Sequence, residues 1–240
     1  GYTHSTVFPT TPGAFQTTRP NGTIGTHIFI TKLNPAAAGA SSLLYSTYLG
    51  GSSGDSLSDM KLDAAGNVYV TGGAFSTDFP VTANAVQSIN KGAAISGATK
   101  TDAFVSKLNL AGGGASDLLY STYLGGADSS DGGSAVGFDS AGNIYLLGAT
   151  SAPDFPVSAC GTPGAYRGVP FIAKLNPAAS GAAGLLYSTT FSGSTGPDNG
   201  TAMIVDANGY AYVTGGAFST DFPDTPGAYH STTSGSNQPF

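Results

Sequence analysis

The residues of this 240-residue sequence that could do chemistry are mostly aspartates, because all fourteen acidic residues are Asp. Asp63, Asp139 and Asp206 recur at one position of a repeated segment. Two carboxylates can hydrolyse a glycosidic bond, but they must differ in role and meet at a single site. An acid that returns at the same place in every copy is typical of a turn cap. We therefore predict that these three aspartates cap turns.

A second set of acids lies in glycine-containing loops, at Asp55, Asp59, Asp128, Asp131 and Asp198. Oxygen-rich loops of this kind can hold Ca²⁺. The spacing of these acids matches neither the EF-hand nor the nonapeptide calcium motif. We predict turn-forming aspartates here, with a calcium site as the alternative.

The remaining reactive side chains form no recognisable catalytic or metal-binding motif. His4, His27 and His230 fall outside the repeated strand-like runs and lack the spacing of paired metal ligands. Cys160 is the single cysteine, so it cannot form an internal disulfide, and we expect a buried or loop thiol. The sequence has no phosphate-binding loop. It therefore predicts no catalytic residue, no cofactor and no bound metal, and a protein that is not an enzyme.

The charge of the chain narrows its partners. The formal net charge is −6, with only eight Lys and Arg residues. Nucleic acids and anionic membrane surfaces are recognised by clustered positive charge, which this sequence lacks. No apolar run is long enough to cross a bilayer. We predict neither a nucleic-acid partner nor membrane insertion.

An internal repeat organises the chain. Residues 69–80 recur without change at 212–223, and degenerate copies lie at 1–9 and 147–156. Each copy continues to Lys-Leu-Asn, at 32–34, 107–109 and 174–176, and then to Leu-Leu-Tyr-Ser-Thr, at 43–47, 118–122 and 185–189. Such a repeat of about 70 residues holds four strand-like runs, rich in β-branched and aromatic residues and separated by Asp- and Gly-containing turns.

These runs predict an all-β fold built from four-stranded antiparallel units. A single meander of this kind cannot bury both of its faces, whereas units stacked around an axis can. We therefore predict β-propeller blades. A pair of β-sandwiches is the alternative architecture.

The combination of Leu-Leu-Tyr-Ser-Thr-Tyr-Leu-Gly-Gly, Asp-x-x-Gly-Asn-x-Tyr-Val-Thr-Gly, Ser-Thr-Asp-Phe-Pro and Thr-Pro-Gly-Ala-Phe resembles the bacterial SBBP beta-propeller repeat, over essentially the whole chain. The third copy departs from the pattern at 190–193 and 206–210. The resemblance implies a propeller in a large secreted or surface-attached protein, and it implies no catalytic residues. The hairpin also resembles that of NHL-type blades, whose first strand is innermost. On that analogy strands a to d run near 58–62, 67–72, 103–109 and 118–124.

The phase of the repeat predicts two whole blades between two complementary halves. Residues 1–50 supply a connector with strands c and d only, 51–125 and 126–192 each supply a blade, and 193–240 supply strands a and b with a connector. All four segments are expected to belong to one propeller-type domain. An open half-blade is a template for strand pairing. Either the chain is part of a longer one, or copies of it complete each other's blades in a closed ring of about six blades or in a fibre.

Two further sets of residues recur at strand positions, namely Lys32, Lys107 and Lys174, and Tyr45, Tyr120 and Tyr187. We expect packing roles for both sets, with a sugar-binding aromatic platform as the alternative for the tyrosines. Asn21 and Asn199 begin formal glycosylation motifs.

These observations favour a non-catalytic extracellular scaffold on the bacterial cell surface or in secreted form, which assembles with copies of itself. An adhesion module that binds a glycan or a surface protein through its variable loops is the alternative. A propeller hydrolase or lyase is the third hypothesis, and it would require acids and histidines that are not repeated to meet at the centre of the ring.

Overall fold

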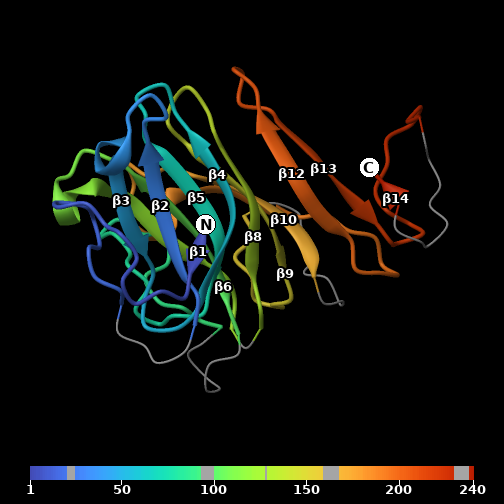
Figure 1. Ribbon diagram of the computed structural model, residues 1–240. Helices are drawn as coiled ribbons and strands as arrows, with labels where there is room; N and C mark the ends of the chain where they lie inside the picture. The colour runs from blue at the N-terminus through green and yellow to red at the C-terminus, as the bar shows by residue number, and fades with distance from the viewer. Residues whose placement is uncertain (21–24, 93–99, 128, 159–167, 230–237) are drawn as a thin grey trace.

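The computed structural model describes residues 1–20, 25–92, 100–127, 129–158, 168–229 and 238–240. These residues form antiparallel sheets of three or four strands, which follow one another along the chain (Figure 1). The predicted all-β fold of propeller blades is confirmed. Within the described residues the sheets do not close into a ring.

Sheet 1 contains β1 (Tyr2–Thr3), β2 (His27–Leu33) and β3 (Leu43–Leu49). Sheet 2 contains β4 (Asp55–Leu62), β5 (Val68–Ala74), β6 (Asp102–Leu108) and β7 (Leu118–Leu124). Sheet 3 contains β8 (Gly132–Phe138), β9 (Ile144–Thr150), β10 (Val169–Leu175) and β11 (Leu185–Thr190). Sheet 4 contains β12 (Asn199–Val205), β13 (Ala211–Ala217) and β14 (Gln238–Pro239). Short 3-10 helices precede the last strands, at Gly39–Ser42 (η1), Gly114–Asp117 (η2) and Gly181–Gly184 (η3).

The two outer sheets are more complete than the sequence predicted. In addition to the two expected strands, sheet 1 has β1. Tyr2 and Thr3 of β1 pair with the beginning of β2, and they correspond to the end of the second strand of a complete blade. Sheet 4 likewise has β14, which pairs with the end of β13. It corresponds to the beginning of the third strand of a complete blade. Both added strands are two residues long, so most of the edge beyond β2 and most of the edge beyond β13 stay open.

The sheets stack face to face in chain order. The first strand of sheet 3, β8, contacts both β4 and β5 of sheet 2, and it contacts β12 of sheet 4 on the other side. Successive first strands therefore meet near one axis, as they do in propeller blades. The core between neighbouring sheets is built from alternate strand residues, for example Ile28 and Ile30 of sheet 1 against Val68 and Val70 of sheet 2.

A repeated aromatic contact explains the Asp-Phe-Pro motif. In every sheet the phenylalanine of the connector stacks or tilts against a second phenylalanine, which lies in β2, β6 or β10 or directly after β14, with ring centroids 4.4–4.5 Å apart. The pairs are Phe8–Phe29, Phe79–Phe104, Phe155–Phe171 and Phe222–Phe240. The connector is thereby held against the face of its own sheet.

No helix in the described part of the chain is long and apolar enough to cross a membrane.

Candidate functional site

Buried aspartates tie each sheet to the one before it. Asp55, at the start of β4, accepts a hydrogen bond from the N–H of Gly51 at 2.9 Å and another from the N–H of Ser76 at 3.1 Å. Gly51 follows the last strand of sheet 1, whereas Ser76 follows β5. One carboxylate therefore joins the loop between two sheets to a loop within the second sheet. Burial raises the pKa of Asp55, against the lowering effect of these N–H donors.

Asp131 and Asp198 repeat this arrangement. The carboxylate of Asp131 accepts N–H hydrogen bonds from Gly126 and Ser151, and that of Asp198 accepts them from Gly193 and Ser219. The prediction that these loop acids only form turns was therefore incomplete, because each bonds two loops that are distant in sequence. The carboxylate oxygens of these aspartates accept hydrogen bonds from N–H groups. Such donors stabilise the negative charge of the aspartate itself and do not form a site for a cation.

Asp59 has a different position within the same strand as Asp55. It accepts the N–H of Val136 at 3.1 Å and pairs with Lys61 at 3.3 Å, so it bonds β4 to β8. Asp128 lies outside the described residues. Among the described residues, no three His, Cys, Asp or Glu side chains gather in a way that could hold a metal ion.

The hairpin aspartates cap turns and also bind a lysine. Asp139 accepts the N–H groups of Ala141 and Asn143 within the turn between β8 and β9. Its other oxygen lies 3.0 Å from Nζ of Lys174, which sits over the ring of Tyr145 at 4.9 Å from the centroid. Although burial opposes ionisation, hydrogen bonds from Asn143 and Lys174 lower the pKa of Asp139 to about 2.

Sheet 2 has the same unit of an aspartate, a lysine and a tyrosine. In the outer sheets the unit is divided, because sheet 4 has the aspartate and the tyrosine and sheet 1 has the lysine. Asp63 pairs with Lys107 at 3.6 Å, and this lysine lies over the ring of Tyr69. In sheet 4, Asp206 makes the same turn hydrogen bonds and accepts the hydroxyl of Tyr212 at 3.2 Å. Within the described residues, however, no lysine pairs with Asp206, and no acid pairs with the equivalent lysine of sheet 1, Lys32.

The histidines are not gathered into a site. His27 was predicted to lie outside the repeated strand-like runs, and this is wrong, because it is the first residue of β2, at the position of Asp102 in β6. His27 is buried beside the ring of Tyr48, and burial, with Arg19 and His4, lowers its pKa. His230, Cys160 and Asn21 lie outside the described residues. Asn199 is the first residue of β12 and accepts the N–H of Gly216.

The three repeated tyrosines have different surroundings. Tyr45 is buried and donates its hydroxyl to Asp117 of sheet 2 at 2.8 Å, and Tyr120 is buried in the core between sheets 2 and 3. Tyr187 of sheet 3 is 43% exposed, although Tyr120 at the same strand position is only 1% exposed. The packing role predicted for these tyrosines therefore describes the first two and not the third.

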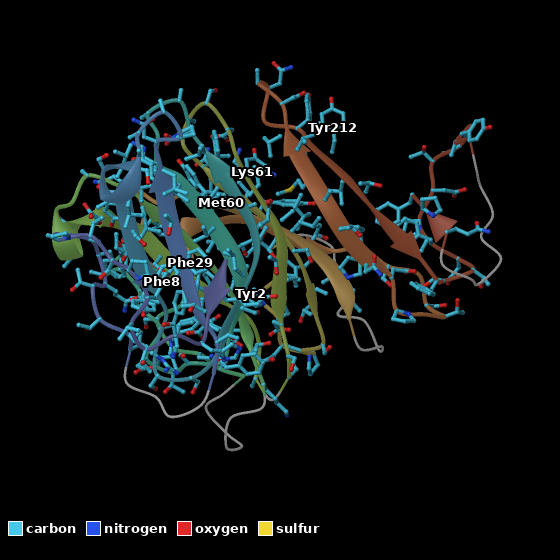
Figure 2. All side chains as sticks on the ribbon, in the orientation of Figure 1. Tyr2, Phe8, Phe29, Met60, Lys61 and Tyr212 are labelled. Atoms are coloured by element: carbon cyan, nitrogen blue, oxygen red, sulfur yellow. The ribbon has the colours of Figure 1, made fainter. Side chains whose placement is uncertain are left out.

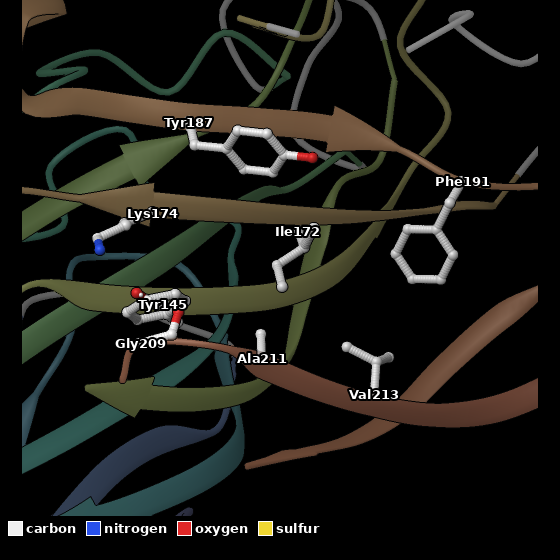
Figure 3. A pocket seen from close by; sticks show the side chains of 8 residues that line it. All are labelled: Tyr145, Ile172, Lys174, Tyr187, Phe191, Gly209, Ala211 and Val213. Carbon is white, nitrogen blue, oxygen red and sulfur yellow. Dashed lines mark hydrogen bonds between the residues drawn. The ribbon is translucent and has the colours of Figure 1, made fainter. Parts of the chain in front are cut away.

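Tyr187 borders a cavity of about 540 Å³ between sheets 3 and 4 (Figure 3). The cavity is lined on one side by residues of β9, β10 and β11, and on the other by Ala211 and Val213 of β13. Figure 3 shows Ile172 and Phe191 facing the β13 side chains across this space. The lining is apolar apart from the hydroxyls of two tyrosines and the amine of Lys174.

Apolar side chains are exposed at the outer sheets. Leu33 of β2 is 61% exposed, while Leu108 and Leu175 at the same position of β6 and β10 are fully buried. Met60 of β4 is 50% exposed, whereas Val136 at the same position of β8 is fully buried. Figure 2 labels Met60 on the sheet 2 side and Tyr212 on the β13 side. We name these surfaces the β2 edge (β2 with Met60 and Leu62) and the β13 edge (β13 with Asp206 and the cavity).

Strand order, the repeated aromatic pair and the aspartate ties all describe one repeating unit, and comparison with known families gives it a name. Residues 119–156 match the SBBP family, a beta-propeller repeat. The predicted resemblance is confirmed over this segment. No curated protein matches the chain.

The matched SBBP segment is out of phase with the sheets. It begins in β7, the last strand of sheet 2, and ends after β9 of sheet 3, at the Phe155-Pro156 contact. This segment contains Asp131 and both loops that Asp131 bonds. In this chain the matched segment therefore spans the junction between two blades rather than one blade, and the matched family is a structural repeat rather than a known catalytic unit.

The open half-blade edges were predicted from the sequence, but the cavity between sheets 3 and 4 and the exposure of Leu33 and Met60 were not. The signal was present in the repeat, because Leu33 aligns with Leu108 and Leu175 while the sheet that would cover it is not among the described residues. Alignment of each apolar position across the repeats, with attention to which copy has a neighbour, would have found both surfaces.

Proposed function

We propose that this chain is a non-catalytic structural scaffold that associates with copies of itself by completing split propeller blades. The observation that carries this proposal is the complementarity of the β2 edge and the β13 edge. Sheet 1 has a third and a fourth strand with an open edge, and sheet 4 has a first and a second strand with an open edge. Together they contain the strands of one blade.

The chemistry of the edges supports association. Exposed strand edges carry unpaired N–H and C=O groups and are templates for another strand. Here the edges also carry exposed apolar residues, among them Leu33, Met60 and Tyr212. Covering such residues stabilises a complex by about 25 cal/mol for each Å² removed from water. Two copies joined at both edges would form a closed ring of about six blades, and copies joined in a line would form a fibre.

The roles of the aspartates support the non-catalytic part of this proposal. The recurring aspartates that the structure describes bond turns, loops or lysines within the fold. They do not lie together around a cleft, and the matched family is a structural repeat. The extracellular location in this proposal rests on the resemblance to SBBP repeats, and fractionation of the native host with an antibody against the chain would test it.

Mass and shape in solution test the association. We expect light scattering after gel filtration, over a hundredfold range of concentration, to show dimers or larger assemblies. Electron microscopy of the same fractions should show closed rings or filaments. A monodisperse monomer at every concentration would overturn the proposal. Hydrolysis of a polysaccharide that is lost on substitution of one Asp would overturn its non-catalytic part.

A further inference from the structure

The residues that line the cavity between sheets 3 and 4 occupy the same strand positions as the residues around a filled site between sheets 2 and 3. Aligned through the strand registers, Tyr145, Ile172, Tyr187 and Ala211 occupy the positions of Tyr69, Val105, Tyr120 and Ile144. The second group of four residues encloses Leu175, the last residue of β10, which is fully buried. The cavity is therefore shaped for a leucine at the end of a third strand.

The exposed leucine of sheet 1 is at that position. Leu33 is the last residue of β2 and pairs with Leu43, as Leu175 pairs with Leu185. It follows Lys32 and precedes Asn34, in the same Lys-Leu-Asn sequence that contains Leu175. Leu33 is exposed in its own sheet because, among the described residues, no preceding sheet covers it.

We propose that the cavity receives Leu33 of a second copy of this chain, and that Lys32 of the second copy pairs with Asp206 and covers the ring of Tyr212. This inference rests on the proposed self-association, and it adds the register and the residues that define it. The occupant is a copy of the chain because β2 carries the leucine and the lysine that the β13 edge lacks.

Charge supports this assignment. In sheets 2 and 3 one lysine lies beside the hairpin aspartate and over the tyrosine ring, with Nζ 4.8 and 4.9 Å from the ring centroids. Asp206 and Tyr212 are arranged like the acid and the tyrosine of those units. Lys32 is exposed and, within the described residues, has no acid beside it. Each edge therefore carries one half of a charge unit that is complete in the two inner sheets.

The registers of the complete sheets set the alignment of the two copies. Tyr69 pairs with Lys107, and Tyr145 pairs with Lys174. The same register places Tyr212 opposite Lys32 of the second copy and Ala211 opposite Leu33. The far ends of the edges are occupied by β1 and β14, so these two-residue strands must leave when β2 pairs along the whole of β13. Phe29 of the second copy then replaces Phe240 against Phe222.

Charge reversal tests the register. Lys32→Glu and Asp206→Lys should each weaken association by about tenfold or more, because each places like charges opposite one another. The double variant restores opposite charges between copies and should recover to within about threefold of the wild-type dissociation constant. Lys91→Glu and Asp224→Lys, which make the same charge changes outside β2, β13 and the hairpin of Asp206, serve as controls. Analytical ultracentrifugation measures all of these, with circular dichroism to show that each variant is folded.

A second substitution tests the cavity. Leu33→Asp should weaken association by about tenfold to a hundredfold, because it would bury an unpaired charge among apolar groups. Leu119→Asp alters another exposed leucine, in β7, and should have no effect. If copies associate but none of the Leu33, Lys32 and Asp206 variants weakens the complex, this register is wrong while the scaffold proposal stands. If the wild-type chain does not associate at all, both proposals fail.

Discussion

At the scale of single residues, one amino acid serves two structural roles in this protein. Asp131 lies between loops and accepts N–H groups, and burial raises its pKa. Asp139 lies at a hairpin beside Lys174, and the pKa of its carboxyl is lowered to about 2 because the hydrogen bonds from Asn143 and Lys174 outweigh burial. The difference arises from partners, since a cation and several donors favour the charged form whereas loss of water disfavours it.

The charge unit of sheet 3 should make stability depend on acid pH. The pKa of Asp139 is lower in the folded chain than its ordinary value of 3.8. Its contribution is therefore present above pH 4 and lost as the pH falls from about 4 to about 2. Asp139→Asn should lower the free energy of unfolding at pH 7 by about 1–3 kcal/mol and should flatten its decline below pH 4. Thermal unfolding followed by circular dichroism between pH 2 and 7 measures both effects.

Asp206→Asn is the control for this prediction, because Asp206 accepts the same two backbone hydrogen bonds but has neither a lysine nor an asparagine side-chain amide beside it in the described structure. At dilutions where copies do not associate, its effect should be smaller than that of Asp139→Asn. Equal effects of the two substitutions would show that Lys174 and the side-chain amide of Asn143 contribute nothing to the stability of the turn.

At the scale of elements, the first strands of sheets 2, 3 and 4 each contain a β-bulge, and the bulge requires a glycine in the neighbouring strand. The pairing of β8 with β9 shifts between Gly133 and Ala135, and Gly148 lies opposite this shift. A Cβ on Gly148 would overlap the carbonyl oxygen of Gly132 and the ring of Phe171. Gly72 and Gly215 face the corresponding carbonyls of β4 and β12. The first glycine of the Tyr-Val-Thr-Gly-Gly motif is therefore required because the two strands approach each other closely at this position.

We expect Gly148→Ala to destabilise the fold by about 1–3 kcal/mol, as an overpacked core substitution does. Gly132→Ala, in the neighbouring strand, places its Cβ in open space and should change stability by less than about 0.5 kcal/mol. Urea unfolding followed by tyrosine fluorescence measures the two variants side by side. Equal stability of the two variants would contradict the explanation of the bulge.

At the scale of the whole molecule, every sheet depends on its neighbours to cover its faces. Sheets 2 and 3 have a neighbour on each side, and their core positions are fully buried, as at Phe104 and Phe171. Sheets 1 and 4 each have one described neighbour. Leu33 and Tyr212 of these sheets are exposed, although Leu108 and Tyr69 at the same strand positions of sheet 2 are buried. Stability in such an array is close to a sum of units and nearest-neighbour interfaces.

Completion of the outer sheets by a second copy should therefore raise the melting temperature with protein concentration. Binding to the folded state stabilises it by mass action. Differential scanning calorimetry over a hundredfold concentration range should show a rise for the wild-type chain. The rise should be smaller in Leu33→Asp, which associates more weakly, and unchanged in Leu119→Asp. A melting temperature that is independent of concentration in the wild-type chain would count against association in the folded state.

Much of the fold could be predicted from local patterns. The alternation of Val68, Tyr69 and Val70 beside an Asp-x-x-Gly-Asn turn depends on neighbours within a few residues, so strand and hairpin were readable. The roles of Asp55 and His27 were not, because Asp55 bonds Ser76 across 21 positions and His27 is buried by side chains from elsewhere in the fold. Contacts between distant segments leave no local pattern in the residues that make them.

The sequence by itself determined the repeat, the strands and the turn acids, because these depend on spacing and on the conformational preferences of short segments. Only the tertiary structure decided which copies of a motif are covered. Leu33, Leu108 and Leu175 stand in the same Lys-Leu-Asn sequence, yet the last two are in the core and the first is exposed. The same leucine is core or interface according to whether a sheet lies against it, and that is a property of the stack of sheets rather than of the motif.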